Sequence, residues 1–437
     1  MGKGIRRTLI GVAAVTAVAF AVPFVVPVSH FIPDITRIAS EKLGQPVTME
    51  DLSLHLLPTP RVIGSRITIG KRAQLMIGEL EITPDLLSFV SGPRTLLLIR
   101  AERVAVHESA LVIPRSMPKG KAGEPILVRR LLLSQVRLEH SRLQLPLFDV
   151  DVEFADGVQV RQARFEARDG SLKLRAEPLG NDVTALEFTA TNWTLPGGAA
   201  LFFDTLAAQG TLKAEQLDLS KIEGVLYGGR IAGTVRADWG KQWELSGTAN
   251  LAGIDLASMQ KALGKPAKLS GRLQADAAFS SRAKTADQLR EALAVDGPFE
   301  VLGGLYQGVD LAKAGNLTGN AAAGDTAFEE LKGRVQLRGE LLRINELCMR
   351  SPKVVAGGHV EIAADRRLSG KLDLSVAKTG GFVGIPVGLS GTTDEPSLLP
   401  SKGYLIGAAI GTVLLPVIGT SIGSSVGSRI EGLSDCK

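Results

Sequence analysis

Apolar and polar residues alternate along most of this chain, and this period of two limits the possible folds more than any other feature. Phe165 and Ala167 alternate with polar residues before an Asp-Gly dipeptide at 169–170, and Leu172 and Leu174 do so after it. Successive side chains of a strand point to opposite faces of a sheet, and Asp-Gly is a preferred two-residue hairpin turn. The pattern therefore predicts β-hairpins that have one apolar face and one polar face.

The length over which this pattern continues sets the size of the sheet. About 350 residues, at ~10–12 per strand and turn and less the helices, make on the order of 20–25 strands. At ~4.8 Å per strand the sheet would extend about 100–120 Å, and a twisted sheet of that length must curl, split or close. We expect a mainly β protein with a long curved antiparallel sheet, in the form of a groove or an elongated barrel, and a few short helices.

The apolar strand faces leave two interpretations open. They either form an ordinary packed core or line an open groove for lipid tails. Aromatic residues make up only 5% of the chain, which leaves few bulky side chains to fill a closed interior. The candidate lipid-facing residues are apolar members of alternating strands: Leu172, Leu174, Leu273, Phe279, Val335, Leu337, Leu372 and Leu374.

Short helices are expected where the alternation stops. Pro33-Asp34 opens one that should end at Gly44, and two more are expected at 85–92 and 254–264. A fourth is expected over 285–294, where Thr285 and Gln288 have the spacing of a capping box. Residues 116–125, rich in Pro, Gly and Lys, are expected to form a loop.

Residues 8–28 form an uncharged run of 21 residues with Lys3, Arg6 and Arg7 just before it. A helix of this length reaches about 30 Å, the thickness of the hydrocarbon core of a bilayer. Basic residues on one side only predict that residues 1–7 stay in the cytoplasm and that the remainder crosses the membrane. The residues expected to anchor the chain are Leu9, Ile10, Val15, Val18, Phe20, Phe24 and Val25.

A cleaved signal peptide is the alternative interpretation of the same run. Ala19 and Ala21 fit the small-residue rule for a cleavage site, and residues 9–18 would serve as its apolar core. The apolar run nevertheless continues to residue 28, which is longer than a signal peptide needs. We therefore expect an anchor that is retained.

A second apolar run, residues 404–427, is rich in glycine and lies in the C-terminal tail, 401–437. Its glycines recur at four-residue spacing, which is typical of helices that pack closely in membranes, and Pro416 divides it. Three interpretations stay open: the run packs on its own domain, forms a hydrophobic tip that touches a membrane or plugs the end of the groove, or spans the membrane.

The sequence contains no convincing catalytic or metal-binding motif. Residues 419–423 match the G-x-S-x-G pattern of hydrolases, but no histidine follows His359 to serve Ser421. The five histidines have no ligand spacing, and the net charge of +5 includes no basic cluster typical of nucleic-acid binding. We expect no enzymatic activity, no cofactor, no metal and no nucleic-acid partner.

The two cysteines, Cys348 and Cys436, have neither metal nor redox spacing. An oxidising compartment would permit them to pair. Because Cys436 lies almost at the C-terminus, where chains fray, we expect them to remain unpaired.

Segments at both ends of the chain resemble AsmA-family proteins. After the apolar run, the stretch LGQPVTMEDLSLHLLPTPRVIGSRITIG is similar to the segment that follows the inner-membrane helix of that family, and 285–400 resembles its C-terminal region. The similarity covers 1–115 and 285–400 well. The middle of the chain shares only the general alternating strand pattern. The matching positions in the first segment are Gly44, Pro46, Val47, Leu52, Leu54, Leu57, Pro58 and Pro60.

This resemblance implies a single-pass protein of the Gram-negative inner membrane whose β-rich body lies in the periplasm and serves outer-membrane biogenesis. Larger relatives resemble bridge-like lipid transfer proteins, which implies phospholipid as a ligand. The alternative is a periplasmic scaffold or chaperone that contacts envelope proteins and affects outer-membrane protein assembly. On this basis the chain divides into a cytoplasmic segment 1–7, the anchor 8–28, an N-terminal β region 29–250, a C-terminal β region 251–400 and the tail 401–437.

We predict that the N-terminus is retained in the mature protein. Protein recovered from membranes should begin at the first residues of the chain and resist a salt wash, because an uncharged 21-residue helix stays in the bilayer. N-terminal sequencing measures this. A mature chain that begins at Val22 and is released by salt would contradict the prediction.

Overall fold

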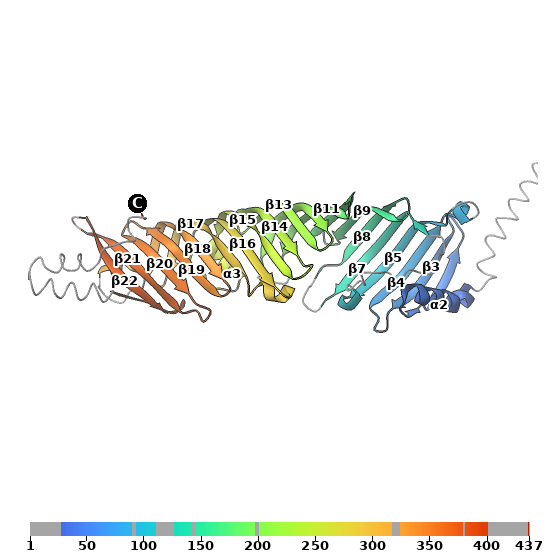
Figure 1. Cartoon of the computed structure of the whole chain (residues 1–437), viewed down its shortest axis with the longest axis horizontal. Coiled ribbons are helices and arrows are strands. Elements are labelled where there is room, and N and C mark those ends of the chain that lie inside the picture. The colour runs from blue at the N-terminus through green and yellow to red at the C-terminus, as the bar shows by residue number, and fades with distance from the viewer. Residues whose placement is uncertain are drawn as a thin grey trace, which may run out of the picture. The chain divides into compact units, whose positions relative to one another are not determined.

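The computed structural model describes residues 28–89, 93–110, 126–140, 145–196, 201–316, 324–378 and 381–400, together with residue 436. These residues form one open mixed β-sheet of 23 strands with a few short helices between them (Figure 1). The expected mainly β fold is confirmed, and the strand number lies in the range that the length argument gave. The sheet is open, which differs from the barrel alternative.

By Cα packing the chain divides into two units, and each is described separately. The N-terminal unit comprises Met1–Thr191 with Pro196–Gly198, and the C-terminal unit comprises Asn192–Leu195 with Ala199–Lys437. The domain boundary proposed at residue 250 from the resemblance lies within a strand of the C-terminal unit, Trp243–Asp255.

The N-terminal unit contains the first eleven strands, although the last residues of β11 belong to the C-terminal unit. The strands are β1 (Val47–Thr48), β2 (Asp51–His55), β3 (Arg61–Ile69), β4 (Leu75–Pro84), β5 (Thr95–His107), β6 (Leu127–Val128), β7 (Arg130–Glu139), β8 (Phe148–Ala155), β9 (Gln159–Ala167), β10 (Leu172–Gly180) and β11 (Val183–Thr194). The helices are η1 (Val28–Phe31), α2 (Ile32–Leu43), η2 (Leu86–Phe89) and η3 (Glu108–Ala110), where η denotes a 3₁₀-helix.

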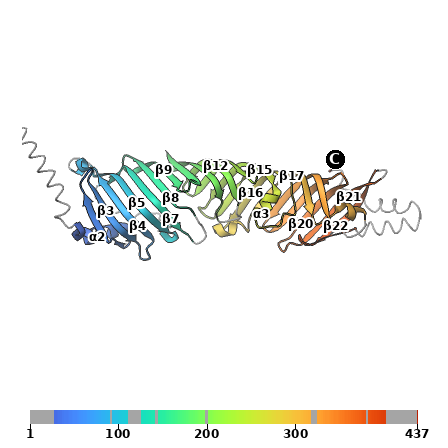
Figure 2. The same ribbon diagram turned by 180° about the vertical axis from the view of Figure 1, so that it is seen from behind.

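The C-terminal unit contains the other twelve strands, whose succession can also be followed from behind in Figure 2. They are β12 (Phe202–Lys213), β13 (Gln216–Leu226), β14 (Gly229–Asp238), β15 (Trp243–Asp255), β16 (Arg272–Ala283), β17 (Ala294–Gln307), β18 (Asp325–Arg338), β19 (Leu341–Arg350), β20 (Val354–Ile362), β21 (Leu368–Lys378), β22 (Gly381–Gly391) and β23 (Pro396–Pro400). The helices are α3 (Leu256–Ala262), η4 (Ala286–Leu289) and α4 (Leu311–Asn316).

The sheet is not antiparallel throughout, and this corrects the expected topology. β5 pairs in parallel with both β6 and β7, for example Ile99 opposite Leu131. A parallel pair needs a crossover connection, and the chain between β5 and β6 provides one. The predicted loop 116–125 belongs to that connection but lies outside the described residues. Alternation alone did not reveal this pair, because a strand has the same period of two whichever way its neighbour runs.

The predicted helices are found, but two of them are shorter and tighter than expected. α2 and α3 occupy the expected places, and Gly44 ends α2 in a left-handed conformation with φ of 64°. The helices expected at 85–92 and 285–294 are single 3₁₀ turns, and the side chain of Thr285 makes no capping hydrogen bond. The sequence analysis missed α4, whose start is held by Thr326: its Oγ1 accepts from Leu311 N–H at 3.0 Å and donates to Val309 O at 2.7 Å.

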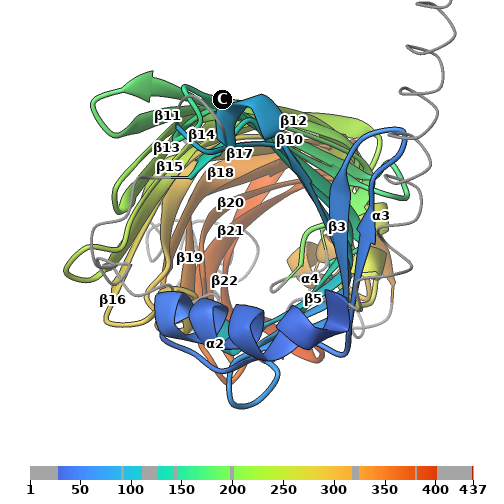
Figure 3. The same cartoon turned by 90° about the vertical axis from the view of Figure 1, so that its right-hand side faces the viewer.

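Among the described residues, the largest hydrophobic core lies in the C-terminal unit, where α3 and α4 pack against strands β17–β22. Leu256 of α3 and Leu311 of α4 belong to one cluster with buried residues of these six strands, among them Leu374, which is 0% exposed. In the view along the strands' stacking direction, α4 lies on the concave side of the sheet (Figure 3). The apolar face of this part of the sheet is therefore the concave face, and the helices fill it.

A disulfide joins Cys348 of β19 to Cys436, with the two Cα atoms 5.4 Å apart. The expectation that the cysteines remain unpaired is therefore wrong. Proximity to the C-terminus did not leave Cys436 free, because it is buried against the sheet, at 8% exposure. The bond spans 88 positions of the sequence.

No helix among the described residues is long and apolar enough to cross a bilayer. All of the predicted anchor residues, from Leu9 to Val25, lie outside those residues, as does the apolar run 404–427. The anchor therefore stays a prediction.

We predict that Leu374→Ala destabilises strands β20–β22 by about 2–5 kcal/mol, because the substitution removes fully buried methyl and methylene groups and leaves a cavity. Leu337→Ala, at a half-exposed position of β18, is the control and should cost about 1 kcal/mol or less. Hydrogen-exchange mass spectrometry of peptides from β20–β22 in the full chain reports the local opening free energy. Equal effects of the two substitutions would show that the helices do not fill this part of the face.

Candidate functional site

Two rows of apolar side chains cross the N-terminal unit from strand to strand. Residues directly opposite each other in neighbouring strands point to the same face, so the pairing register defines each row. The first row consists of Leu52, Gly64, Leu80, Ala101, Leu133, Val150, Phe165, Leu174 and Phe188. The second row consists of Leu54, Val62, Ile82, Ile99, Leu131, Val152, Ala163, Ala176 and Leu186.

These rows form the apolar face of the N-terminal unit, and the face is only partly covered. Every member of the second row is half-buried and none is fully buried. In the first row, Leu52, Gly64, Ala101 and Val150 are buried and the others are half-buried. The residues packed into the cluster around Ala101 and Val150 come from strands only. A continuous aliphatic surface therefore remains partly exposed.

The opposite face of the same strands is charged. Glu81 of β4 lies between Arg61 of β3 at 3.7 Å and Arg100 of β5 at 3.5 Å. Arg130 binds Asp151 through two hydrogen bonds of 2.9 and 2.8 Å, and these bonds hold the pKa of the Asp151 carboxyl below its usual value. Partly exposed pairs of this kind each contribute roughly 0.2–1 kcal/mol, so their main effect is to keep this face polar.

The concave face of the C-terminal unit has a filled half and an open half. The filled half follows one row of opposed residues that α3 and α4 cover: Ile254, Leu273, Val301, Leu331, Met349, Ala356, Leu374 and Ile385. The open half follows a second row nearer the other ends of the strands: Phe279, Val295, Leu337, Leu342, Ile362 and Leu368. All six residues of the open half are half-buried, and none belongs to a described core cluster.

The structure divides the predicted lipid-facing residues between these surfaces. Leu172 and Leu174 lie on the apolar face of the N-terminal unit and are half-buried. Phe279, Val335 and Leu337 are half-buried and lie outside the filled half. The other three residues belong to the filled half or pack against it: Leu273, Leu372 and Leu374.

Sequence reasoning missed most members of the two rows in the N-terminal unit, such as Ile99, Leu131 and Val152. Each of them stands in an alternating segment, so the signal for a strand was present. The register that aligns them across the parallel pair of β5 and β7 is a tertiary property and has no local signal.

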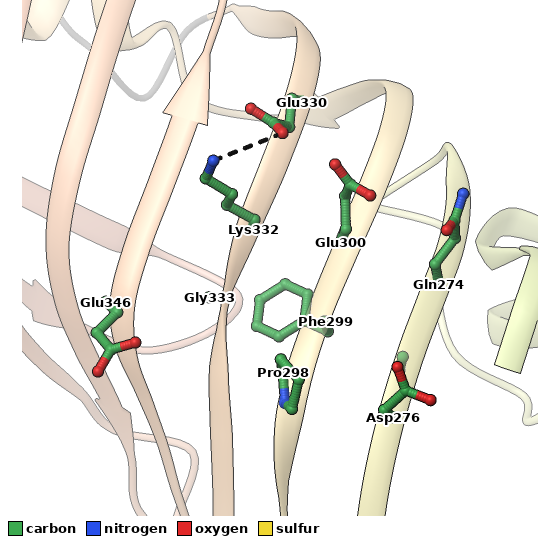
Figure 4. A pocket seen from close by; sticks show the side chains of 10 residues that line it. Gln274, Asp276, Pro298, Phe299, Glu300, Glu330, Lys332, Gly333 and Glu346 are labelled. Carbon is green, nitrogen blue, oxygen red and sulfur yellow. Dashed lines mark ion pairs between the residues drawn. The ribbon is translucent and has the colours of Figure 1, made fainter. Parts of the chain in front are cut away.

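A cleft of about 720 Å³ opens on strands β16–β19 in the C-terminal unit (Figure 4). Gln274, Glu300 and Lys332 are direct partners across β16, β17 and β18, so they share one face. Each is next in sequence to a member of the filled row, so this face is the one opposite to the filled half. Its charged lining consists of Asp276, Glu300, Glu330, Lys332 and Glu346. Four carboxylates and one ammonium group make this cleft acidic.

Two carboxyl groups in the cleft interact directly. A hydrogen bond with the Glu330 carboxyl, with added contributions from burial and from charge repulsion by Glu330, raises the pKa of Glu300. Glu330 itself is 9% exposed and forms ion pairs with Arg350 and with Lys332, whose Nζ lies 3.7 Å from Oε1. The residues that line the cleft include no serine, threonine, cysteine or histidine.

Among the described residues, no group of His, Cys, Asp or Glu is arranged to hold a metal ion. Ser421, the candidate of the G-x-S-x-G match, lies outside the described part of the chain. No protein-family model, no curated protein and no solved structure matches this chain.

We predict that Glu300→Gln stabilises the C-terminal unit at neutral pH. A carboxyl whose pKa is raised by folding contributes stability below its ordinary pKa of ~4.3, and that contribution is lost as the pH rises through the raised value. The glutamine keeps the hydrogen bond to Glu330 without the charge. The difference in melting temperature between variant and wild type should therefore be near zero at pH 4 and positive at pH 7.5.

The control is Glu330→Gln, which removes the ion pairs with Lys332 and Arg350 and should lower the melting temperature at pH 7.5. A Glu300→Gln variant that is less stable than wild type at pH 7.5 would be incompatible with the contact between the two carboxyl groups.

Proposed function

We propose that this chain is an AsmA-like, inner-membrane-anchored periplasmic protein of cell-envelope biogenesis, and that its apolar sheet surfaces bind phospholipid acyl chains. The observation that carries the proposal is the second row of the N-terminal unit. Nine apolar side chains in register cross nine strands, and all of them are half-buried. A sheet face of this kind needs an apolar partner, because exposed contiguous apolar surface is unfavourable in water.

The size of the hydrophobic gain makes an acyl chain a suitable partner. Each methylene group that leaves water contributes ~0.8 kcal/mol, so ten of them contribute about 8 kcal/mol. The rows consist mostly of Leu, Ile, Val and Ala, which offer a smooth aliphatic surface and no specific hydrogen bond. Such a surface supports binding of lipid tails without discrimination between headgroups and without any chemistry on the lipid.

The disulfide supports the proposed location. Disulfides form and persist in oxidising compartments, including the bacterial periplasm, and are rare in the cytosol. A body that carries the bond between Cys348 and Cys436 is therefore suited to the periplasm. The orientation inferred from Lys3, Arg6 and Arg7 leads to the same location.

The proposal predicts lipid crosslinks from the open apolar surfaces only. A photo-reactive amino acid at position 174 or 337, in the full chain in intact cells, should crosslink to phospholipid. The matched controls are positions 173 and 336, the preceding residues, which point to the opposite face. Detection is by mass spectrometry of the purified protein.

Position 374 provides a second control. Leu374 alternates with polar residues as Leu174 and Leu337 do, but it lies in the filled half of the concave face. Lipid labelling at 174 and 337 that does not exceed labelling at 173 and 336, in protein that keeps its disulfide, would refute lipid binding. Crosslinks to envelope proteins from the same positions would favour the scaffold alternative instead.

A further inference from the structure

The face opposite to the filled half carries an unusual patch on strands β19–β22. Cys348, Gly357, Asp373 and Pro386 are successive cross-strand partners, and Ser375 lies two residues beyond Asp373 on β21. Their chain neighbours, such as Met349, Ala356 and Leu374, point into the core. By alternation these five residues point the other way, and we call them the outer patch.

The outer patch is buried although it lies on the side of a single-layer sheet that faces away from the core. Cys348 is 2% exposed, Ser375 is 7% exposed and Gly357 is buried. On the same face, His359 of β20 and Lys371 of β21 lie two residues further along their strands and are exposed. Burial also raises the pKa of the Asp373 carboxyl. Something therefore covers one end of these strands and not the other.

Charged residues border the outer patch on this face: Lys332 of β18 is the direct partner of Cys348, and Arg350 follows Cys348 by two residues on β19. At the other ends of β19 and β20, Arg343 and Glu361 form an ion pair of 2.8 Å on this face. Within the outer patch Asp373 is the one ionisable side chain, since Cys348 is bonded to Cys436. The other four residues of the patch are uncharged, and Gly357 and Ser375 are small, which suits close packing of another chain segment.

The position of Cys436 shows which segment reaches this surface. Besides its bond to Cys348, its Sγ lies 3.6 Å from the carbonyl oxygen of Ala356 on β20, and the residue is 8% exposed. The chain thus leaves the sheet at Pro400, the end of β23, and returns to β19. Four strand spacings separate these points, about 19 Å, which roughly six extended residues would cross.

The intervening segment is far longer than this distance requires. It comprises the 35 residues 401–435, and most of it is the apolar, glycine-rich run 404–427. Glycines at four-residue spacing let a helix backbone approach closely, and the outer patch offers Gly357 and Ser375 as small counterparts. The segment 401–435 continues from β23, which pairs with the patch strand β22, and at its other end Cys436 is bonded to the patch residue Cys348.

We propose that residues 401–435 dock on the outer patch and that the disulfide fastens the end of this docked segment. The segment is then part of the C-terminal unit, instead of a membrane tip or a plug for the apolar face. This inference does not depend on lipid binding by the concave face, since it concerns the opposite side of the sheet.

Intramolecular photo-crosslinking tests the proposal in the full chain in native membranes. A photo-reactive residue at position 355, the direct partner of Ser375 on β20, should crosslink to peptides from 401–435. The matched control is position 359, on the same strand and face but exposed, and its yield of such peptides should be at least several-fold lower. Digestion and mass spectrometry identify the linked peptides.

The reverse experiment places the photo-reactive residue at position 410, within the segment, and leaves the sheet unchanged. It should crosslink to peptides from β20 or β21. Mass mapping with and without reductant, which should find the bond between Cys348 and Cys436 in each variant, establishes that the unit is folded. Crosslinks from 410 to lipid, or an equal yield of tail peptides from 355 and 359, would overturn the proposal.

Discussion

The structure depends on one constraint: a sheet built from alternating strands has an apolar face, and the described residues supply no second layer over most of this sheet. Cross-strand pairing places apolar residues in rows, so any uncovered part becomes a continuous aliphatic surface and not a set of isolated side chains. The hydrophobic effect acts on the area removed from water. The fold must therefore fill such a surface with its own residues or leave it for a partner.

The two units differ in how far their own residues cover the apolar face. In the C-terminal unit, α3 and α4 supply Leu256 and Leu311 to the concave face, and strands β17–β22 become a packed core beneath them. In the N-terminal unit, the residues that pack into the described cluster come from strands, and the second row stays half-exposed along its whole length. The proposed lipid surfaces are thus the parts of one repeated pattern that none of the described helices covers.

The opposite face of the N-terminal unit is charged. Ion pairs such as those of Glu81 and Asp151 continue from strand to strand and keep that face polar. In the C-terminal unit, charged residues border the outer patch on the face opposite to the filled half, and the disulfide lies within the patch. Cys348 is buried although it lies on the face opposite to the core, and it is bonded to Cys436 near the end of the chain. We therefore interpret the patch as a docking surface.

The sequence by itself determined that the chain is mainly β, approximately how many strands it has, where α2 and α3 lie and that Asp169 and Gly170 form a turn. These features follow from local periodicity and turn chemistry. It did not determine the parallel pairing of β5 and β7, the short α4 or the bond between Cys348 and Cys436. Leu337 and Leu374 stand in identical alternating patterns, yet Leu337 remains half-exposed and Leu374 is fully buried. Only the tertiary structure decided between them, because burial of a strand residue depends on what packs over the sheet, and that partner comes from a distant part of the chain.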